Sequence, residues 1–395
     1  MACKPRIQNK IISCLQIAVG GSVSFVAINF FNGNDNFYQS CVKPALFTLC
    51  TPEFAHFFAV KCARFGIVPS FSIKEEDLPL LKTTVWGLNF KNPVGLAAGF
   101  DKNGEAIRGL KRLGFGFIEV GSVTPLPQDG NEKPRVFRLT EDEAIINSKG
   151  YRRAYNYIRM QWLNQKKRGD LIVGVNLGKN KEAVDATSDY VNGMINFYTN
   201  ESVDYYTINI SSPNTPGLRN LQKGDELRNL IVKLLEAKVR YQLNKPLLVK
   251  IAPDLSYEEK KAIADIVMNE KCGKVKVDGL VVSNTTIQRP ESLKSDKKLV
   301  SETGGLSGKP LKELSTQAIR DMYKLTRGTI PIIGVGGISN GEDAFEKIKA
   351  GASLIQIYSA LVYEGPSVVS KINRELAELL RKHGYSNIKE AIGKE

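Results

Sequence analysis

The chain has 395 residues, of which 42% are hydrophobic and 24% charged, a composition typical of a globular protein. Its length exceeds the usual size of a single core, so we expect one large domain with a smaller appendage. The formal net charge is +14, but Lys and Arg are scattered and no nucleic-acid motif accompanies them, so nucleic acid is not an expected partner. An anionic lipid surface together with a small anionic substrate accounts for this charge equally well.

Cysteine and histidine limit the chemistry that the chain can perform. Five of the six cysteines lie in the first 62 residues and none has zinc-ligand spacing, so we expect most of them to be small buried apolar residues. The only histidines are His56 and His383. A His-based catalytic triad or a His-rich metal site can hardly be built from two histidines, and no metal site is predicted.

The N-terminus combines basic residues with a long uncharged stretch. Lys4, Arg6 and Lys10 precede residues 11–34, and no acidic residue occurs before Asp35. As a helix, residues 11–31 would extend roughly 30 Å, enough to cross a bilayer core. This pattern predicts a mitochondrial-type targeting signal whose apolar segment is retained as a single-pass membrane anchor. The alternative is a cleaved secretory signal, whose apolar region would be shorter. By the positive-inside rule, the short basic N-terminus stays on the matrix side, and the bulk of the chain lies on the other side of the membrane.

Two short apolar helices are predicted next. Residues 37–50 carry apolar side chains at helical spacing, and Thr51 caps a second helix with Pro52 at its first position. The second helix carries more phenylalanine than one docking face needs. The pair either packs simply on the main domain or lies half-sunk in lipid, lining a passage for a lipophilic ligand.

From residue 78 onward, short apolar runs alternate with helical stretches. The runs are rich in β-branched residues, as buried parallel strands are, and lie at residues 94–98, 117–120, 172–176, 205–210, 247–251, 279–283, 332–334 and 354–358. Eight strand–helix units predict an α/β (β/α)8 TIM barrel. A doubly wound sheet competes, but no G-x-G-x-x-G motif follows the first strand. Residues 121–171 are too long for a simple connection, and we expect a small β-excursion there, with strands at 135–139 and 144–147.

Polar residues follow nearly every predicted strand, at the end where a barrel builds its active site. They include amides, hydroxyls and one or two lysines, but no paired carboxylates and no metal-ligand set, which argues against glycosidase and metal-dependent chemistry. Fixed amide donors and acceptors suit a planar heterocycle with imide and carboxylate edges. Gly336 and Gly337, with the end of the eighth strand, predict a phosphate cradle. Any single amide at these positions could simply cap its loop by hydrogen bonding to the backbone. Polar residues at nearly every strand end are not explained in this way.

Several of these segments resemble dihydroorotate dehydrogenase of the membrane-bound, quinone-using class. They are NPVGLAAGFD (92–101), FGFIEVGSVTP (115–125), KPRVFRL (133–139), GVNLGKNK (174–181), NISSPNT (209–215), VKIAPDL (249–255), SNTT (283–286), ETGGLSGKP (302–310) and PIIGVGG (331–337). The resemblance covers essentially the whole barrel. It divides the chain into a targeting and transmembrane segment (1–34), a helical quinone-tunnel domain (35–70) and a flavin-binding barrel (71–395), and it implies the mitochondrial inner membrane and its lipid.

The resemblance implies oxidation of dihydroorotate to orotate with FMN and transfer of the electrons to ubiquinone. The matching cofactor positions are Ala98, Gly99, Ser122, Asn176, Asn209, Lys250, Ser283, Gly308, Gly337, Tyr358 and Ser359. The matching substrate positions are Lys102, Asn147, Asn209, Asn214, Asn284 and Thr285. Ser212 matches the catalytic serine, a weak base that needs a shielded site and a relay through Thr215 and water. His56 and Arg138 match positions along the quinone path.

One segment departs from the family pattern. Asn147 and Gly150 are retained, but Tyr151 stands where the family has phenylalanine, and Arg152 stands where it has asparagine. The phenylalanine helps to seal the catalytic base from solvent, so turnover could differ. A divergent FMN-binding paralogue with weak or no dihydroorotate oxidation is therefore the alternative. A related flavin barrel acting on another small anion is a third reading.

Overall fold

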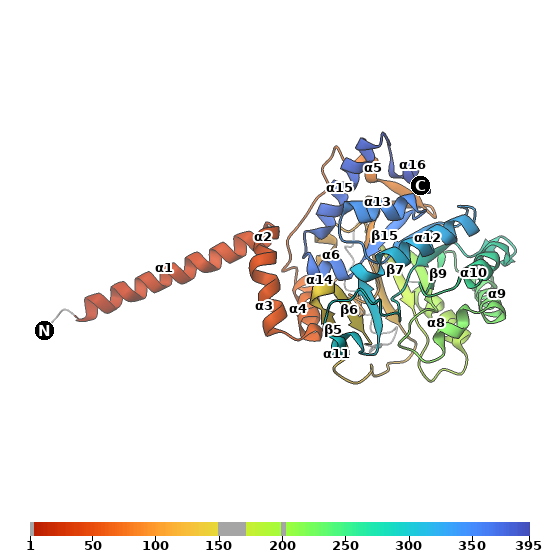
Figure 1. The fold of residues 1–395 in the computed structure, drawn as a ribbon, viewed down its shortest axis with the longest axis horizontal. Helices are drawn as coiled ribbons and strands as arrows, with labels where there is room; N and C mark the ends of the chain where they lie inside the picture. Colours follow the sequence, from red (N-terminus) through yellow and green to blue (C-terminus); the bar gives the residue numbers. More distant parts are fainter. Residues whose placement is uncertain (1–3, 149–170, 199–202) are drawn as a thin grey trace.

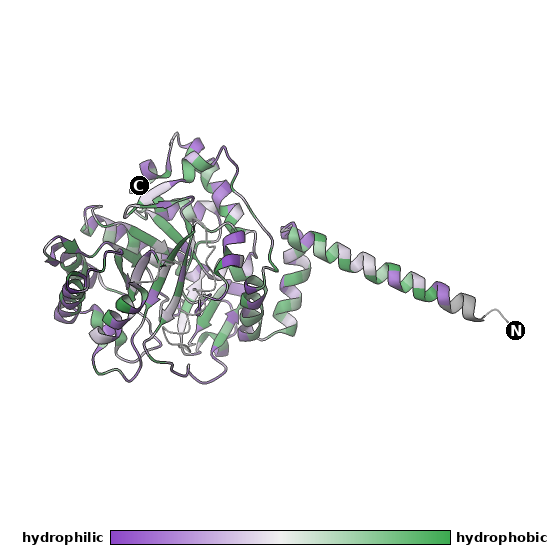
Figure 2. Ribbon diagram, turned by 180° about the vertical axis from the view of Figure 1, so that it is seen from behind, coloured by the Kyte–Doolittle hydropathy of each residue, from purple (hydrophilic) through white to green (hydrophobic). Residues whose placement is uncertain are grey.

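The computed structural model describes residues 4–148, 171–198 and 203–395 of the chain. Figure 1 shows a long isolated helix at the N-terminus, a short helical segment beside it, and an α/β body that contains the rest of the chain. The long helix is α1 (Lys4–Phe31). Its residues Asn9–Phe31 are long and apolar enough to cross a membrane, and this stretch is not buried against the protein. Figure 2 shows α1 standing away from the body with apolar residues along most of its length.

The helical segment after α1 differs in detail from the prediction. In place of one helix over residues 37–50, the chain forms α2 (Asp35–Phe37), a π-helical turn (Tyr38–Val42) and α3 (Lys43–Leu49). Pro44 explains the break, because its ring conflicts with the carbonyl group one turn earlier and its nitrogen has no hydrogen to donate. The next helix, α4 (Pro52–Arg64), begins as predicted, with Thr51 Oγ1 accepting a hydrogen bond of 3.3 Å from Phe54 N.

The predicted barrel is confirmed. Eight parallel strands close on themselves in the order β12-β14-β15-β3-β4-β7-β8-β9. In chain order they are β3 (Val94–Leu96), β4 (Phe117–Val123), β7 (Ile172–Leu177), β8 (Tyr205–Asn209), β9 (Leu247–Ile251), β12 (Gly279–Val282), β14 (Ile332–Val335) and β15 (Leu354–Ile357). Each coincides with a predicted apolar run to within a few residues. Their residues are almost all buried, which explains the near-continuous apolar pattern.

Helices cover the outside of the barrel. The longer ones are α6 (Ile107–Arg112), α8 (Ala186–Tyr198), α9 (Gly224–Arg240), α10 (Tyr257–Asn269), α12 (Lys312–Leu325), α13 (Gly341–Lys349) and α15 (Val368–Lys382). Short helices are α5 (Leu78–Leu81), α11 (Lys297–Val300), α14 (Ser359–Tyr363) and α16 (Ile388–Ala391). Helix α10 begins with a capping box, in which Ser256 and Glu259 satisfy each other's backbone N–H groups. The prediction of buried cysteines is wrong for the described residues: Cys14 and Cys41 are exposed, and Cys50, Cys62 and Cys272 are partly exposed.

A hairpin closes the N-terminal end of the barrel. Strands β1 (Thr83–Val85) and β2 (Leu88–Phe90) pair antiparallel, and Trp86 between them donates a hydrogen bond of 2.7 Å to the carbonyl of Asp278. The hairpin packs on a layer of apolar side chains from the starts of the strands, formed by Phe117, Ile172, Tyr205, Leu248, Val281, Ile333 and Leu354. The barrel is therefore sealed at this end, and its opposite end carries the polar residues.

The β-excursion is larger than predicted. Strands β5 (Val136–Leu139) and β6 (Ala144–Asn147) pair as expected, and β13 (Gly305–Gly308) adds a third antiparallel strand on the other side of β6. The glycines and serine of β13 lack the apolar alternation that marks a strand, so the sequence gives no signal for it. In this sheet Ile145 lies opposite Arg138 on one neighbour and Ser307 on the other.

Ion pairs fasten the helical segment to the barrel. Glu53 of α4 pairs with the buried Arg135 at 2.8 Å, just before β5. At the other end of α4, Lys61 and Arg64 both reach Glu105, at 2.7 and 3.0 Å. Glu105 belongs to the loop that follows β3. Helix α4 is thus held against two loops at the open end of the barrel.

Candidate active site

The open end of the barrel contains a cavity of about 1340 Å³, measured to its open mouth, which we call the mouth cavity. Its wall includes every predicted substrate position, Ser212, and all but one of the predicted cofactor positions: Ala98, Gly99, Lys102, Ser122, Asn147, Asn209, Ser212, Asn214, Lys250, Ser283, Asn284, Thr285, Gly308, Gly337, Tyr358 and Ser359.

Asn176 is the predicted cofactor residue that does not line the mouth cavity. It lies fully buried behind Ser122, whose hydroxyl donates to Asn176 Oδ1. Its own amide nitrogen donates to Glu119 Oε1 at 2.8 Å. Asn176 therefore supports the wall from behind in this structure.

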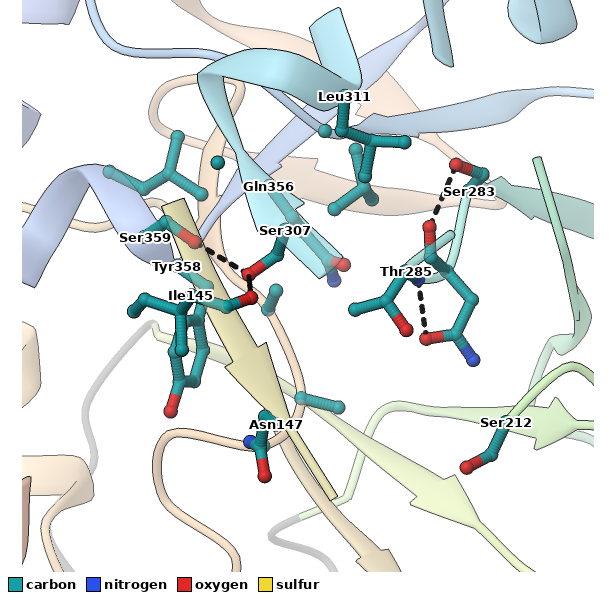
Figure 3. Close-up of a pocket in the computed structure, with 18 of the residues that line it drawn as sticks. Ile145, Asn147, Ser212, Ser283, Thr285, Ser307, Leu311, Gln356, Tyr358 and Ser359 are labelled. Atoms are coloured by element: carbon teal, nitrogen blue, oxygen red, sulfur yellow. Dashed lines mark hydrogen bonds between the residues drawn. The ribbon is translucent and has the colours of Figure 1, made fainter. Parts of the chain in front are cut away.

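A chain of hydrogen-bonded amides runs along the floor of the mouth cavity. Asn209 Nδ2 donates to Ser122 Oγ at 2.9 Å, and Asn284 Nδ2 donates to Asn209 Oδ1 at 3.2 Å. The far end is fixed by the backbone N–H of Thr285, which donates to Asn284 Oδ1 at 2.8 Å (Figure 3). The near end is fixed by Glu119, because an ionised carboxylate only accepts. Both ends demand the same orientation, so each amide presents a defined edge.

Glu119 lies at the centre of this support and is completely buried. Besides Asn176, it accepts hydrogen bonds from Tyr205 at 3.2 Å, Thr207 at 3.1 Å and Gln356 at 3.0 Å. These partners come from β7, β8 and β15, so one carboxylate joins the interior faces of four strands, its own included.

Lys250 supplies the positive charge of the cavity wall. It lies at the end of β9, beside Asn209 in the strand register, and only 5% of it is exposed. Burial lowers the pKa of its ammonium group, and the charge of Glu119 acts in the opposite direction. A buried cation at this place can bind a carbonyl group or an anion on the edge of a planar ligand.

One buried acceptor in the wall lacks a partner. Gln356 lines the mouth cavity, and its Oε1 has no hydrogen-bond partner among the described residues, whereas its Nε2 is used by Glu119. An unsatisfied buried acceptor costs about 1–3 kcal/mol unless a ligand donates to it. A planar ligand with imide N–H and carbonyl groups therefore fits this wall.

The phosphate end of the predicted cofactor site is formed by β14 and α14. Gly336 and Gly337 follow β14 with φ angles of 124° and 68°. A Cβ on Gly337 would lie 2.4 Å from Cα of Lys312, so only glycine fits at this position. Ser307 and Ser359 lie opposite, with hydroxyl oxygens 2.9 Å apart (Figure 3). Backbone N–H groups and hydroxyls in this arrangement suit an anion.

The expected catalytic serine lies on the loop after β8. Ser212 is 7% exposed, lines the mouth cavity, and accepts a hydrogen bond of 3.3 Å from Asn214 N. Asn214 in turn donates to the carbonyl of Asn147 at 3.0 Å. Thr215, the expected relay residue, lines the same cavity. The substituted positions Tyr151 and Arg152 lie outside the described residues.

A partly buried ion pair that the motifs did not reveal fixes two of these loops. Arg219 donates to the carbonyls of Ser211 and Thr285, each at 3.0 Å, and pairs with Asp254 at 2.8 Å. The guanidinium group thus bridges the loops after β8 and β12, which carry Ser212 and Asn284.

A second cavity of about 1170 Å³ lies between the helical segment and the barrel, and we call it the apolar passage. Its wall comes from α1, α3, α4 and the loops after β3 and β15, and is made largely of Phe, Leu, Val, Ala and Pro side chains, among them Phe30, Leu46, Phe47, Phe58, Ala59, Val68, Pro69, Phe100, Leu361 and Val362. Helices α3 and α4 border this space, and α4 also packs on the barrel through its ion pairs, so both features of the predicted helical pair are present.

The two predicted quinone-path residues both line the apolar passage. His56 on α4 places Nε2 2.8 Å from the carbonyl oxygen of Phe100. Arg138 on β5 donates to the carbonyls of Leu46 and Cys50, and its guanidinium lies 4.3 Å from the ring centre of Phe47. Burial lowers the pKa of Arg138. These two side chains are among the polar groups that an apolar ligand with a carbonyl headgroup would meet, together with Tyr38 and Tyr358.

The two cavities share part of their walls. Tyr358, directly after β15, and Ile145 of β6 line both of them. Phe100 and His56 pack against the Tyr358 ring from the passage side. Figure 3 shows Tyr358 and Ile145 next to each other at the edge of the mouth cavity.

The sequence predictions also missed other wall and support residues, among them Glu119, Gln356 and Ser307. A signal existed for the first two, because Glu119 interrupts the apolar run FIEV and Gln356 the run LIQI. A polar residue inside a strand buried on both faces needs buried partners, and here those partners belong to the site. Ser307 lies on the strand that was not predicted.

Comparisons with known proteins agree with this geometry. The family model described as "Dihydroorotate dehydrogenase" matches residues 80–380. The protein named "Dihydroorotate dehydrogenase (quinone), mitochondrial" from Mus musculus is 47% identical over 397 residues, which is 98% of both chains. A "Dihydroorotate dehydrogenase (quinone)" from Azorhizobium caulinodans is 47% identical over 89% of this chain and 97% of its own.

A solved structure is also similar. The crystal structure of DHODH from Eimeria tenella in complex with ferulenol superposes with a TM-score of 0.80 and 42% identity, over 89% of this chain and 98% of that one. Members of one family thus match the chain over most of its length, in sequence and in fold. The chain belongs to the dihydroorotate dehydrogenase family.

Proposed function

We propose that this chain oxidises dihydroorotate to orotate and passes the electrons to a quinone. The observation that carries this proposal is the meeting of two unlike cavities: a polar one with fixed amides and an apolar one that reaches the helical segment. A polar substrate and a lipophilic acceptor can then approach the same centre from different sides. The relatives that match the chain carry names with this substrate and acceptor.

The family is flavin-dependent, and we propose FMN as the flavin. Gly336, Gly337 and Ser359 would bind its phosphate, and Lys250, Asn209 and Gln356 would face its ring. The backbone turn at Gly337 and the unsatisfied Gln356 Oε1 fit such a ligand. Bound FMN would supply a two-electron acceptor that takes a hydride from the substrate and later releases the electrons singly or in pairs.

The protein's own part in the oxidation is to hold the substrate and to accept a proton. Asn147, Asn214 and Asn284 present amide edges to an imide, and the Lys102 ammonium suits a carboxylate. Ser212 would take the proton from C5 as the hydride leaves C6, which converts dihydroorotate to orotate. The burial of Ser212 excludes bulk water from this step.

We propose that the apolar passage admits ubiquinone from the membrane, with His56 and Arg138 along its path. The segments 1–34, 35–70 and 71–395 would then serve as membrane anchor, passage domain and flavin barrel. The location we propose is the mitochondrial inner membrane, with a single pass through the lipid and the bulk of the chain outside the matrix. The mouse relative has "mitochondrial" in its name and aligns over almost the whole chain, and α1 contains a stretch able to span a bilayer.

The decisive test is to purify the full chain in detergent, confirm bound flavin, and add dihydroorotate without oxygen. The oxidised-flavin absorbance should disappear within seconds and return when a soluble ubiquinone is added. Flavin that binds but stays oxidised would favour the divergent paralogue, which no relative reported above supports by name. The matched control is the chain with Tyr151→Phe and Arg152→Asn, which restores the family residues. An equal rate in both proteins would show that the departure is harmless.

Membrane attachment needs a separate test. The chain without residues 1–32 should lose binding to vesicles that contain anionic lipid, and it should keep both half-reactions with a water-soluble quinone. Vesicle binding that persists would place the attachment in α3 and α4 instead.

A further inference from the structure

The barrel interior contains one acidic and one basic side chain. The eight barrel strands, all of them within the described residues, carry two charged residues, Glu119 on β4 and Lys250 on β9. Each lies two positions beyond a member of the apolar layer at the closed end, Phe117 and Leu248 respectively. Side chains two apart on a strand share a face, so both point into the barrel directly above that layer.

Lys250 shares the barrel interior with the acidic side chain of Glu119, although no direct ion pair joins these two described residues. The groups that face Glu119 are neutral at physiological pH: the amides of Asn176 and Gln356, the hydroxyl of Thr207 and the phenol of Tyr205. The Tyr205 phenol keeps its proton, because burial and the nearby Glu119 carboxylate raise its pKa well above 10. Attraction by Glu119 is what opposes the effect of burial on Lys250.

Building on the proposed function, we infer that Glu119 is a positioning residue: it keeps Lys250 cationic in the wall that would face the flavin, and it anchors the amide chain that runs from Asn176 to Asn284. Glu119 does not line the mouth cavity, so it acts through other residues. A cation at the ring edge stabilises the negative charge that the flavin gains on reduction. Loss of the Glu119 charge would let Lys250 release its proton at a lower pH.

The experiment measures the reduction potential of bound flavin against pH, with a chemical reductant and a reference dye. The plot of reduction potential against pH should become steeper above a certain pH, which we call the break. The pH of the break reports deprotonation of Lys250 in the oxidised protein. Glu119→Gln, which keeps the shape of the side chain, should move this break to lower pH by about one unit or more. Lys250→Met should abolish the break, which assigns it to Lys250.

Two controls separate charge from packing. Thr207→Val removes one hydrogen bond to Glu119 but no charge, so the break should move by less than about 0.3 unit. Glu119→Asp keeps the charge on a shorter side chain and should return the break towards its original pH. An unchanged break in Glu119→Gln, or an equal shift in Thr207→Val, would overturn the inference.

The outcome stays decisive if Glu119→Gln does not fold. The double variant Glu119→Gln with Lys250→Met removes both charges. Recovery of folding would show that an unbalanced Lys250 caused the failure. Continued failure would assign Glu119 a packing role and overturn the inference. Because the potential is set with a chemical reductant, the result does not depend on dihydroorotate oxidation. Failure of dihydroorotate to reduce the flavin would count against the proposed function alone.

Discussion

The mouth cavity and the apolar passage lie side by side but are built in different ways. The mouth cavity is lined from strand ends, and hydrogen bonds hold its amides in one orientation, from Glu119 to Thr285. The passage is lined mainly from helices and loops, and its few polar groups include His56 and Arg138. A polar substrate requires fixed donors and acceptors, whereas a lipophilic one requires apolar surface and space. This difference predicts that substitutions in the mouth cavity leave re-oxidation of the flavin by quinone intact. Substitutions in the apolar passage should likewise leave reduction of the flavin by dihydroorotate intact.

The largest effect should come from the proposed base. Ser212→Ala should slow reduction of the flavin by dihydroorotate by about 10²–10⁴-fold, the range typical of a lost general base. Anaerobic stopped-flow absorbance measures this step directly. Re-oxidation of pre-reduced flavin by quinone is the internal control and should stay within about twofold of the parent. An equal loss in both steps would break the comparison between the cavities.

The support of the mouth cavity should respond to pH through Lys347. This fully buried lysine of α13 donates to Lys312 O and Ser315 Oγ, each at 2.7 Å, and Ser315 contacts the carbonyl of Gly336. Burial lowers the pKa of Lys347 to about 7, so the unfolded chain binds more protons between pH 7 and the unfolded pKa of 10.5. Folding stability therefore rises with pH across that window, and below pH 7 this contribution becomes constant because both states are protonated.

Lys347→Met should remove this dependence. The free energy of unfolding of the parent should rise relative to the variant by about 3 kcal/mol between pH 7 and pH 10. Urea unfolding of the detergent-solubilised chain at several pH values tests this. A constant difference between the two proteins would mean that Lys347 titrates normally.

A smaller effect is expected in the apolar passage. Arg138→Met removes the donor to the carbonyls of Leu46 and Cys50, and it should raise the KM for quinone about tenfold, as expected for a lost charged hydrogen bond. Arg138→Lys keeps the positive charge but not the planar guanidinium group, so its KM for quinone should lie between the values of the parent and of Arg138→Met. Flavin reduction by dihydroorotate should not change. A comparable loss there would show that the passage and the mouth cavity are coupled.

The smallest effect should come from the hydroxyl of Tyr358, the residue common to both walls. Burial raises the pKa of Tyr358 to about 12, so the phenol stays protonated over the working pH range and does not act as a phenolate base. Tyr358→Phe should change either half-reaction by less than about threefold. Tyr358→Ala, which removes the ring between the cavities, is the control and should slow both steps. A large loss in Tyr358→Phe would assign the hydroxyl a role in proton transfer.

Sequence patterns predicted the eight barrel strands and most residues of the mouth cavity, because strand periodicity and strand-end positions are local properties of the chain. They did not predict β13 or the π turn at Tyr38–Val42, which depend on pairing with β6 and on the proline that follows. They also missed the partners of Glu119, which come from three other strands. Such contacts are set by barrel closure and leave no spacing in the sequence.

The small sheet of β5, β6 and β13 makes the protein sensitive to changes in length as well as to substitution. Ile145 and Asn147 lie two positions apart on β6, so they share a face, and both line the mouth cavity. Arg138 lies opposite Ile145 across the β5–β6 pair. Inserting or deleting one residue in the turn at 140–143 would shift this register and turn these side chains to the opposite face. A single-codon indel there should therefore abolish both half-reactions at once.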